Sequence, residues 1–321
     1  MKRLIGLMAT ILLSMLLMPG CEKDSSQPLA EDDESIVTQM AQEEDDEYLF
    51  DEGIDDGSED NMYDGYSSFG KVFTPIDSVK RFGRKVLQRP RRVITDVQRI
   101  GPDTIRVFTA REFVGQFVIF SKPDDSTVVR YTKPLRHVVR RVALYVRRNP
   151  NEVTGRRGWE LAEVSLGQGN SVPMATIQIK EITITGSGGV SVVYTNPLHT
   201  MLSVPDDILL FSPGETVTVQ VKLSNSTLNP VDPLGNGSTE TVLLHFGVNR
   251  QHHARKRFEY VGVDPVTGDQ VYEGSWTIGQ QPFRLRHAVV DAIDNGTIFD
   301  DDATTYPYNS TTWSAPYRVI P

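Results

Sequence analysis

The sequence predicts a mainly β protein, in which an antiparallel β-rich domain precedes a β-sandwich. From about residue 90 onward, short runs rich in Val, Ile, Phe, Tyr and Thr are separated by turns that contain Gly, Pro and Asp. Several runs alternate apolar and polar residues, the pattern of a strand with one buried face. Because the chain contains a single cysteine, we expect its β cores to form without an internal disulfide.

Residues 1–21 have the organisation of a secretory signal. Lys2 and Arg3 supply a positive start, an apolar stretch covers residues 4–18, and Gly20 stands immediately before Cys21. The stretch is shorter than the about 20 residues that a membrane-spanning helix needs. No comparable apolar run follows it, so we expect no span downstream.

The segment Leu17 to Cys21 resembles the lipobox of bacterial lipoproteins, in which the cysteine is acylated and becomes the mature N-terminus. The resemblance implies lipidation of Cys21 and a place in the bacterial cell envelope, anchored in the outer membrane and facing the periplasm or the surface. Two or more acyl chains, at ~0.8 kcal/mol per buried CH₂, give a stable anchor. The alternative is an ordinary cleaved signal followed by a free thiol.

Residues 22–70 are predicted to be a disordered acidic tether. Acidic runs recur through the segment, and Lys23 is its one basic residue. Few apolar residues are available to offset the entropy of ordering. A neutral coil of this length would span roughly 40 Å, and repulsion between like charges should extend it further. Calcium binding at residues 51–57 is the alternative, but that segment lacks the spacing of a calcium loop.

Residues 71–172 form the expected antiparallel β-rich domain, which is strongly basic between residues 80 and 157. Residues 135–148 carry apolar side chains at helical spacing but are rich in β-branched residues, so they are either a strand or a short helix. The other expected strands are residues 91–100, 104–110, 113–120, 127–131 and 158–165.

The arginines of this domain suggest an anion-binding surface, because guanidinium groups contact phosphate and carboxylate in bidentate fashion. The partner would be an anionic envelope polymer or a protein, and nucleic acid is not expected for an exported chain. The alternative is internal, with the acidic tether neutralising the basic domain. The candidate anion-binding residues are Arg91, Arg92, Arg140, Arg141, Arg147 and Arg148.

Residues 173–321 predict the β-sandwich. Val217, Val219, Val221 and Leu223 alternate with polar residues and should face the core. Residues 264–269 have the turn chemistry of a hairpin loop. About seven strands at short spacing are typical of a sandwich. We expect residues 190–194 and 284–293 to be sheet edges that are free to contact partners.

The segment at residues 213–221, Pro-Gly-Glu-Thr-Val-Thr-Val-Gln-Val, resembles an early strand of bacterial immunoglobulin-like modules, including the CARDB-like domains related to cell adhesion. The resemblance spans roughly the last 145 residues and rests on the strand pattern. It implies an Ig-like sandwich that presents or binds other molecules, although a fold alone does not fix function.

No phosphate-binding loop and no nucleophile elbow occurs in the sequence. His245, His252, His253 and His287 lack the spacing of a zinc site and are expected on the surface. Calcium is a possible cofactor, because hard oxygen ligands cluster near Gly296, although the same residues are typical of a tight turn. The candidate calcium ligands are Asp291, Asp294, Asn295, Asp300, Asp301 and Asp302.

These features favour a non-enzymatic, lipid-anchored envelope protein that acts as a binding or structural module, with its membrane partner reached through the acyl chains on Cys21. One alternative is a carbohydrate-active or glycan-binding accessory protein, in which Trp159, Trp276 or Trp313 stacks on sugar rings. Another is a component of a larger envelope assembly.

Overall fold

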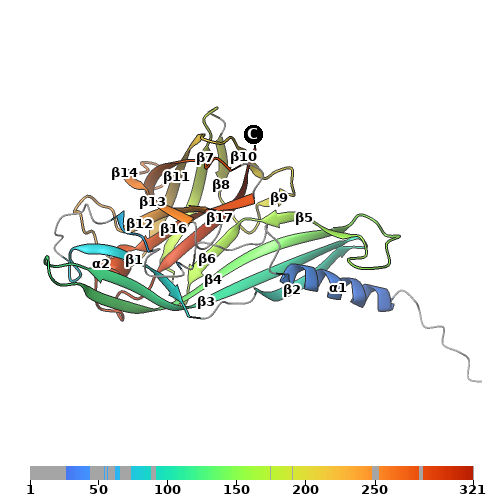
Figure 1. Ribbon diagram of the computed structural model, residues 1–321, viewed down its shortest axis with the longest axis horizontal. Coiled ribbons are helices and arrows are strands. Elements are labelled where there is room, and N and C mark those ends of the chain that lie inside the picture. The colour runs from blue at the N-terminus through green and yellow to red at the C-terminus, as the bar shows by residue number, and fades with distance from the viewer. Residues whose placement is uncertain are drawn as a thin grey trace, which may run out of the picture.

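The computed structural model describes residues 27–43, 54, 56, 62–65, 74–87, 92–173, 175–189, 191–247, 253–281 and 285–320. The prediction of a mainly β, antiparallel fold is confirmed (Figure 1). The strands form a 12-stranded sheet, called sheet A, and a 5-stranded sheet, called sheet B. One pair of strands, β10 with β17, is parallel.

Sheet A has the central order β1-β3-β4-β6-β17-β16-β12-β13, with four short or peripheral strands attached to it. Its strands are β1 (Val79–Val86), β2 (Arg92–Gly101), β3 (Thr104–Ser121), β4 (Val129–Arg147), β5 (Trp159–Ser165), β6 (Gly167–Ser171), β9 (Met201–Ser203), β10 (Leu209–Phe211), β12 (Glu240–Gly247), β13 (His253–Arg257), β16 (Leu285–Asp294) and β17 (Ser310–Val319). The segment that combined helical spacing with β-branched residues is therefore a strand, β4.

Sheet B packs on the C-terminal part of sheet A and forms the predicted sandwich. Its order is β14 (Glu259–Val263), β15 (Gln270–Thr277), β11 (Thr216–Asn225), β7 (Ile177–Thr185) and β8 (Ser191–Tyr194). As predicted, Val217, Val219, Val221 and Leu223 of β11 are buried, and they share one apolar core with Val290 and other residues of sheet A. Alternation at period two thus sets which face of β11 enters the core.

Of the two expected edges, one is an edge and the other is not. β8 ends the strand order of sheet B, as the sequence predicted for residues 190–194. β16, expected as an edge, instead lies between β12 and β17 and is buried from Arg286 to Asp294. Its continuous run of buried residues is the pattern of a strand covered on both faces.

Sheet A contains strands from both sides of the domain boundary that the sequence predicted between residues 172 and 173. Thr311 to Ser314 of β17 pair with Gly167 to Asn170 of β6, and β6 in turn pairs with β4. The first half of the chain and the sandwich are therefore joined by backbone hydrogen bonds across a continuous sheet. The sequence shows no local signal for this pairing, because the partner strands are separated by more than 130 residues.

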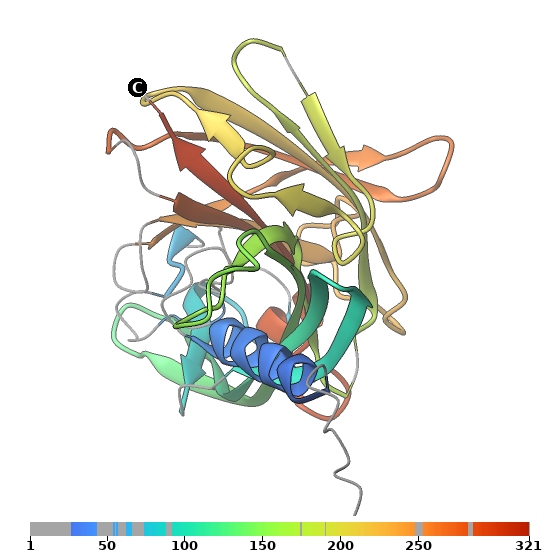
Figure 2. The same cartoon turned by 90° about the vertical axis from the view of Figure 1, so that its right-hand side faces the viewer.

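Sheet A also curls, so that strands far apart in its order face each other (Figure 2). Four strands separate β1 from β16 in the sheet, yet Arg84 of β1 lies 2.6 Å from Asp291 of β16. A second apolar core fills the space beside this contact. It includes Phe82, Phe117, Leu135, Ile293, Phe299 and Tyr308.

The helix α1 (Gln27–Gln42) is a difference from the sequence-based prediction, because it lies within the segment expected to be a disordered tether. Val37, Met40 and Ala41 are buried against Ile105 and Trp159 of sheet A. These helix residues have the spacing of one helical face. The helix is stable because this face is packed, although its acidic composition alone favours disorder.

The charges of α1 are neutralised by the sheet. The Asp33 carboxylate is buried and lies 3.5 Å from Arg99, 3.7 Å from Arg147 and 3.9 Å from Arg157. Glu43, just beyond the helix, lies 2.8 Å from Arg156. Part of the acidic segment therefore neutralises some arginines of the basic domain, and an external anionic partner stays a prediction.

We predict that the substitution Val37→Asp undocks α1, because it places a carboxylate in an apolar contact at a cost of about 2–4 kcal/mol. Hydrogen exchange should show faster exchange of the α1 amides, while the amides of β3 and β4 keep their protection. The matched control is Gln39→Asp, which adds the same charge on the exposed face of the same helix. Equal exchange in the two variants would contradict this packing.

Candidate functional site

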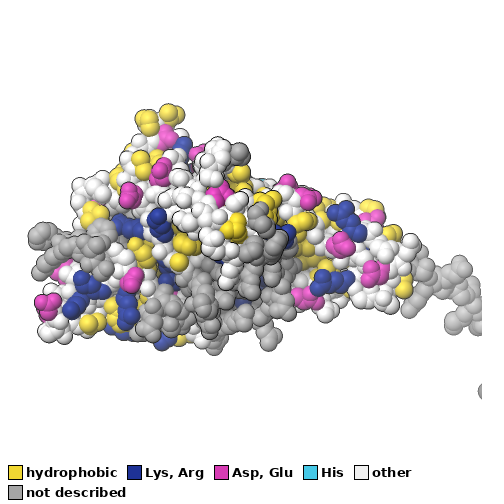
Figure 3. Space-filling model, turned by 45° about the horizontal axis from the view of Figure 1, so that its top comes forward, with side chains coloured by type: hydrophobic (Ala, Val, Ile, Leu, Met, Phe, Trp, Pro, Cys, Tyr) yellow, Lys and Arg dark blue, Asp and Glu magenta, His cyan; other side chains and the backbone are white. Residues whose placement is uncertain are grey.

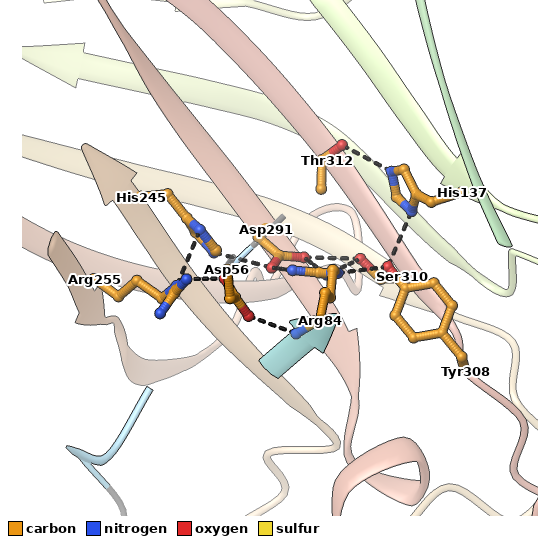
Figure 4. Close-up of polar contacts among 9 residues, drawn as sticks. All are labelled: Asp56, Arg84, His137, His245, Arg255, Asp291, Tyr308, Ser310 and Thr312. Atoms are coloured by element: carbon orange, nitrogen blue, oxygen red, sulfur yellow. Dashed lines mark hydrogen bonds and ion pairs between the residues drawn. The ribbon is translucent and has the colours of Figure 1, made fainter. Parts of the chain in front are cut away.

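A buried polar network, centred on Arg84 and Asp291, occupies the interior of the curled sheet (Figure 4). We call it the Arg84 network. It connects β1, β4, β12, β13, β16 and β17, so it draws on both halves of the chain. Its members are Asp56, Arg84, His137, His245, Arg255, Asp291, Tyr308, Ser310 and Thr312.

The central pair is a bidentate ion pair. Arg84 Nη1 donates to Asp291 Oδ2 at 2.6 Å, and Nη2 donates to Oδ1 at 2.8 Å. The same guanidinium donates to Tyr308 Oη at 2.7 Å and to Ser310 Oγ at 3.0 Å. Both charged groups are almost fully buried, with 2% and 0% of their side chains exposed. Burial alone would raise the pKa of Asp291, but Arg84 and His245 outweigh it and hold that pKa below its ordinary value.

On the other side of Asp291, a histidine extends the network towards a second buried arginine. His245 Nε2 lies 3.0 Å from Asp291 Oδ2, and Arg255 Nε donates to His245 Nδ1 at 3.3 Å. Because Nδ1 accepts, this pattern assigns the proton to Nε2, which donates to Asp291. Arg255 pairs with Asp56, which also accepts from the Arg84 backbone N–H. Burial lowers the pKa of Arg255 to about 10, partly opposed by Asp291.

His137 on β4 completes the network at the opposite end. Tyr308 Oη lies 3.0 Å from His137 Nδ1, and His137 Nε2 lies 3.2 Å from Thr312 Oγ1. Burial, together with the nearby positive charge of Arg84, lowers the pKa of His137 to about 3. The imidazole is therefore neutral at physiological pH. Gly169 makes room for this contact, since a Cβ there would lie 2.4 Å from His137 Nε2.

The network has residue types found in catalytic sites, but its connections are those of a structural junction. Ser310 Oγ donates to Asp291 at 2.7 Å, and no described histidine is bonded to it as a base. In a nucleophilic triad, histidine stands between the serine and the carboxylate. Here the carboxylate is saturated by Arg84, His245 and Ser310. The arrangement holds strands together rather than exposing a reactive group.

The structure does not gather the six predicted calcium ligands around one point. Asp291 faces Arg84, whereas Asp294 accepts from Asn225, Thr227 and the Gly296 backbone. The Asp294 contact to Gly296 caps the short helix α2 (Asn295–Phe299). The Asn295 side chain bonds Thr241 and Ser238. Asp300 and Asp302 accept from backbone amides of their own turn, and Asp301 is exposed.

Asp294 and Asp302 thus have the turn and capping roles that the sequence also suggested. Among the residues with described side chains, no group of three or more His, Cys, Asp and Glu is placed to hold a metal ion. Calcium binding stays a prediction.

The predicted anion-binding arginines do not form one surface. Arg92 is buried and donates to the Ala41 and Glu43 carbonyls at the end of α1, and Arg147 lies beside Asp33. Arg141 is buried and donates to Ser314 Oγ at 2.6 Å. Arg140 and Arg148 are exposed, and Arg91 lies outside the described residues, as does Cys21.

The burial of side chains decides two further expectations, one for the histidines and one for the tryptophans. His245 and His287 are buried rather than on the surface, while His252 and the His253 side chain lie outside the described part. Trp159, Trp276 and Trp313 are each at most 4% exposed and belong to the apolar cores. Their rings are therefore not free to stack on sugars. A surface pocket of about 400 Å³ exists elsewhere, lined by Tyr63, Asn236, Arg257, Glu259 and Tyr260 among others.

No protein-family model matches the chain, and a search of curated proteins finds no match.

We predict that Arg84→Met lowers the free energy of unfolding by about 3–5 kcal/mol, because it leaves the Asp291 carboxylate buried with its main partner removed. The double variant Arg84→Met/Asp291→Leu should recover part of the loss, since no buried charge remains unpaired. Urea denaturation measures both. The control is Arg136→Met, which breaks the exposed pair with Glu112 and should cost at most about 1 kcal/mol. A similar loss in the two single variants would contradict the role of burial.

We also predict that acid destabilises the protein through His137. The folded-state pKa of about 3 lies below the ordinary value of 6.5, so between these pH values the unfolded chain binds more protons, and lowering the pH favours unfolding. The contribution is at most on the order of 5 kcal/mol. His137→Gln should flatten the dependence of unfolding free energy on pH in this window. The exposed His199 gives the control, His199→Gln, for which an equally flattened curve would refute the assignment.

Proposed function

We propose that the protein is a lipid-anchored, non-enzymatic module of the bacterial cell envelope, with a binding or structural role. The observation that carries the non-enzymatic part is the closure of the Arg84 network. Its serine, histidines, aspartates and tyrosine bond one another inside the core, as in a structural junction. The residues before and at Cys21 support the anchor, because they have the order of a signal and lipobox.

The sandwich supports a role in presenting a surface. Under this proposal it is an Ig-like module whose exposed sheet edges face possible partners. Val193 on β8, and Val261 and Val263 on β14, are more than half exposed on strands that end the order of sheet B. An edge strand offers backbone groups to another chain, and exposed apolar side chains add contact area.

In the part of the chain that the structure describes, no helix has both the length and the apolar character to cross a bilayer.

We predict that Cys21→Ser transfers the protein from the membrane fraction to the soluble fraction, with about a tenfold or greater loss of membrane-bound protein. The loss follows because acyl chains contribute ~0.8 kcal/mol per buried CH₂. Cell fractionation measures the distribution, and mass spectrometry of the mature N-terminus tests for the acyl groups. Ser25→Ala is the control in the same segment. An unmodified N-terminus in wild-type protein would overturn the proposal.

A further inference from the structure

We propose that the end of sheet A formed by the β2–β3 turn and the β4–β5 loop faces and touches the lipid head groups. This membrane-facing end comprises residues 99–103 and 147–157. The inference rests on the proposed lipidation of Cys21 and adds to it an orientation and a contact surface.

The direction of α1 places the start of the helix at this end of the sheet. In the first half of the helix, Asp33 is in contact with Arg99, Arg147 and Arg157, which flank the turn and the loop. Near the helix end, Arg92 donates to the Ala41 carbonyl at 3.0 Å. Since Arg92 and Arg99 lie at opposite ends of β2, α1 runs antiparallel to that strand and its N-terminus points outward (Figure 1).

The turn and the loop belong to the same end of the sheet. The Arg147 backbone N–H donates to the Asp103 carbonyl at 3.0 Å, which joins the end of β4 to the β2–β3 turn. Arg99 also donates to the Pro102 carbonyl within that turn. These hydrogen bonds hold the β2–β3 turn against the end of β4, where the β4–β5 loop begins.

Few residues separate the proposed anchor, Cys21, from the start of α1. α1 begins at Gln27, six residues after Cys21. Six residues extend at most about 20 Å, at 3.3–3.6 Å each. An extended tether of 49 residues would have left the orientation free, whereas a docked helix so close to the acyl chains limits it.

The side chains of this end suit a head-group surface. Val153 is 76% exposed and Ile100 is 49% exposed, both beside bends of the chain. Arg148 is exposed, and Arg156 is 64% exposed despite its pair with Glu43. Figure 3 shows basic and hydrophobic side chains, with acidic ones among them, over the narrow end of the molecule. Apolar side chains flanked by arginines bind anionic interfaces, an unpaired arginine adding about 1 kcal/mol, and the exposed Asp103 and Glu152 reduce this attraction.

The test uses the full-length acylated protein with one added cysteine, Val153→Cys, which carries the free thiol once Cys21 is acylated. The thiol is labelled with an environment-sensitive fluorophore. The protein is placed in vesicles of phosphatidylethanolamine and phosphatidylglycerol that contain spin-labelled head groups. The matched control is Val266→Cys, in the exposed β14–β15 turn, and β14 lies on the side of the molecule away from the α1 N-terminus (Figure 1). Thermal unfolding checks that both variants fold.

We expect the Val153→Cys probe to be quenched about twofold or more relative to the Val266→Cys probe, because only the former lies at the interface. Equal quenching, or stronger quenching at position 266, in protein that floats with the vesicles would overturn the orientation and leave the lipid anchor standing. Failure of the wild-type protein to float with vesicles would overturn the anchor itself, and the orientation with it.

Discussion

The buried ion pair between Arg84 and Asp291 is the constraint on which the curled sheet depends. Removing two charges from water costs several kcal/mol each, and the loss is offset only by close geometry and further hydrogen bonds. Tyr308, Ser310 and His245 provide those bonds. The pair also fixes register, because a slip of one residue in β1 would turn Arg84 to the opposite face of the strand. A buried ion pair thus specifies how β1, at one end of the strand order of sheet A, meets β16.

This junction and the β6–β17 pairing make the two halves of the chain interdependent. β17 pairs with β6 of the first half and with β16, whose residues alternate between two cores. Val290 and Ala292 face the sandwich core, while Asp291 and Ile293 face the core beside β1. A change at β16 therefore affects both cores, and the halves should unfold as one cooperative unit rather than as two domains.

Local patterns in the sequence predicted the elements whose structure is set locally. The alternation in β11 and the turn at residues 264–269 between β14 and β15 both follow from short-range chemistry. The sequence did not indicate β6, because Gly167 and Gly169 weaken a strand pattern. Those glycines are required by the close approach of Arg141 and His137. Nor could it indicate the partner of Arg84, which lies 207 residues away. Long-range pairing leaves no periodic signal.

The helix α1 shows how composition can conceal a packed element. Its residues Val37, Met40 and Ala41 have helical spacing, but the surrounding carboxylates favour disorder when the segment is considered alone. The arginines of sheet A reverse that balance, because Asp33 among three guanidinium groups is stabilised where it would otherwise be a buried, unpaired charge. Arg92, Arg99, Arg147, Arg156 and Arg157 of the basic domain therefore hold its own acidic segment. An external anion would have to use the arginines that remain exposed, such as Arg140 and Arg148.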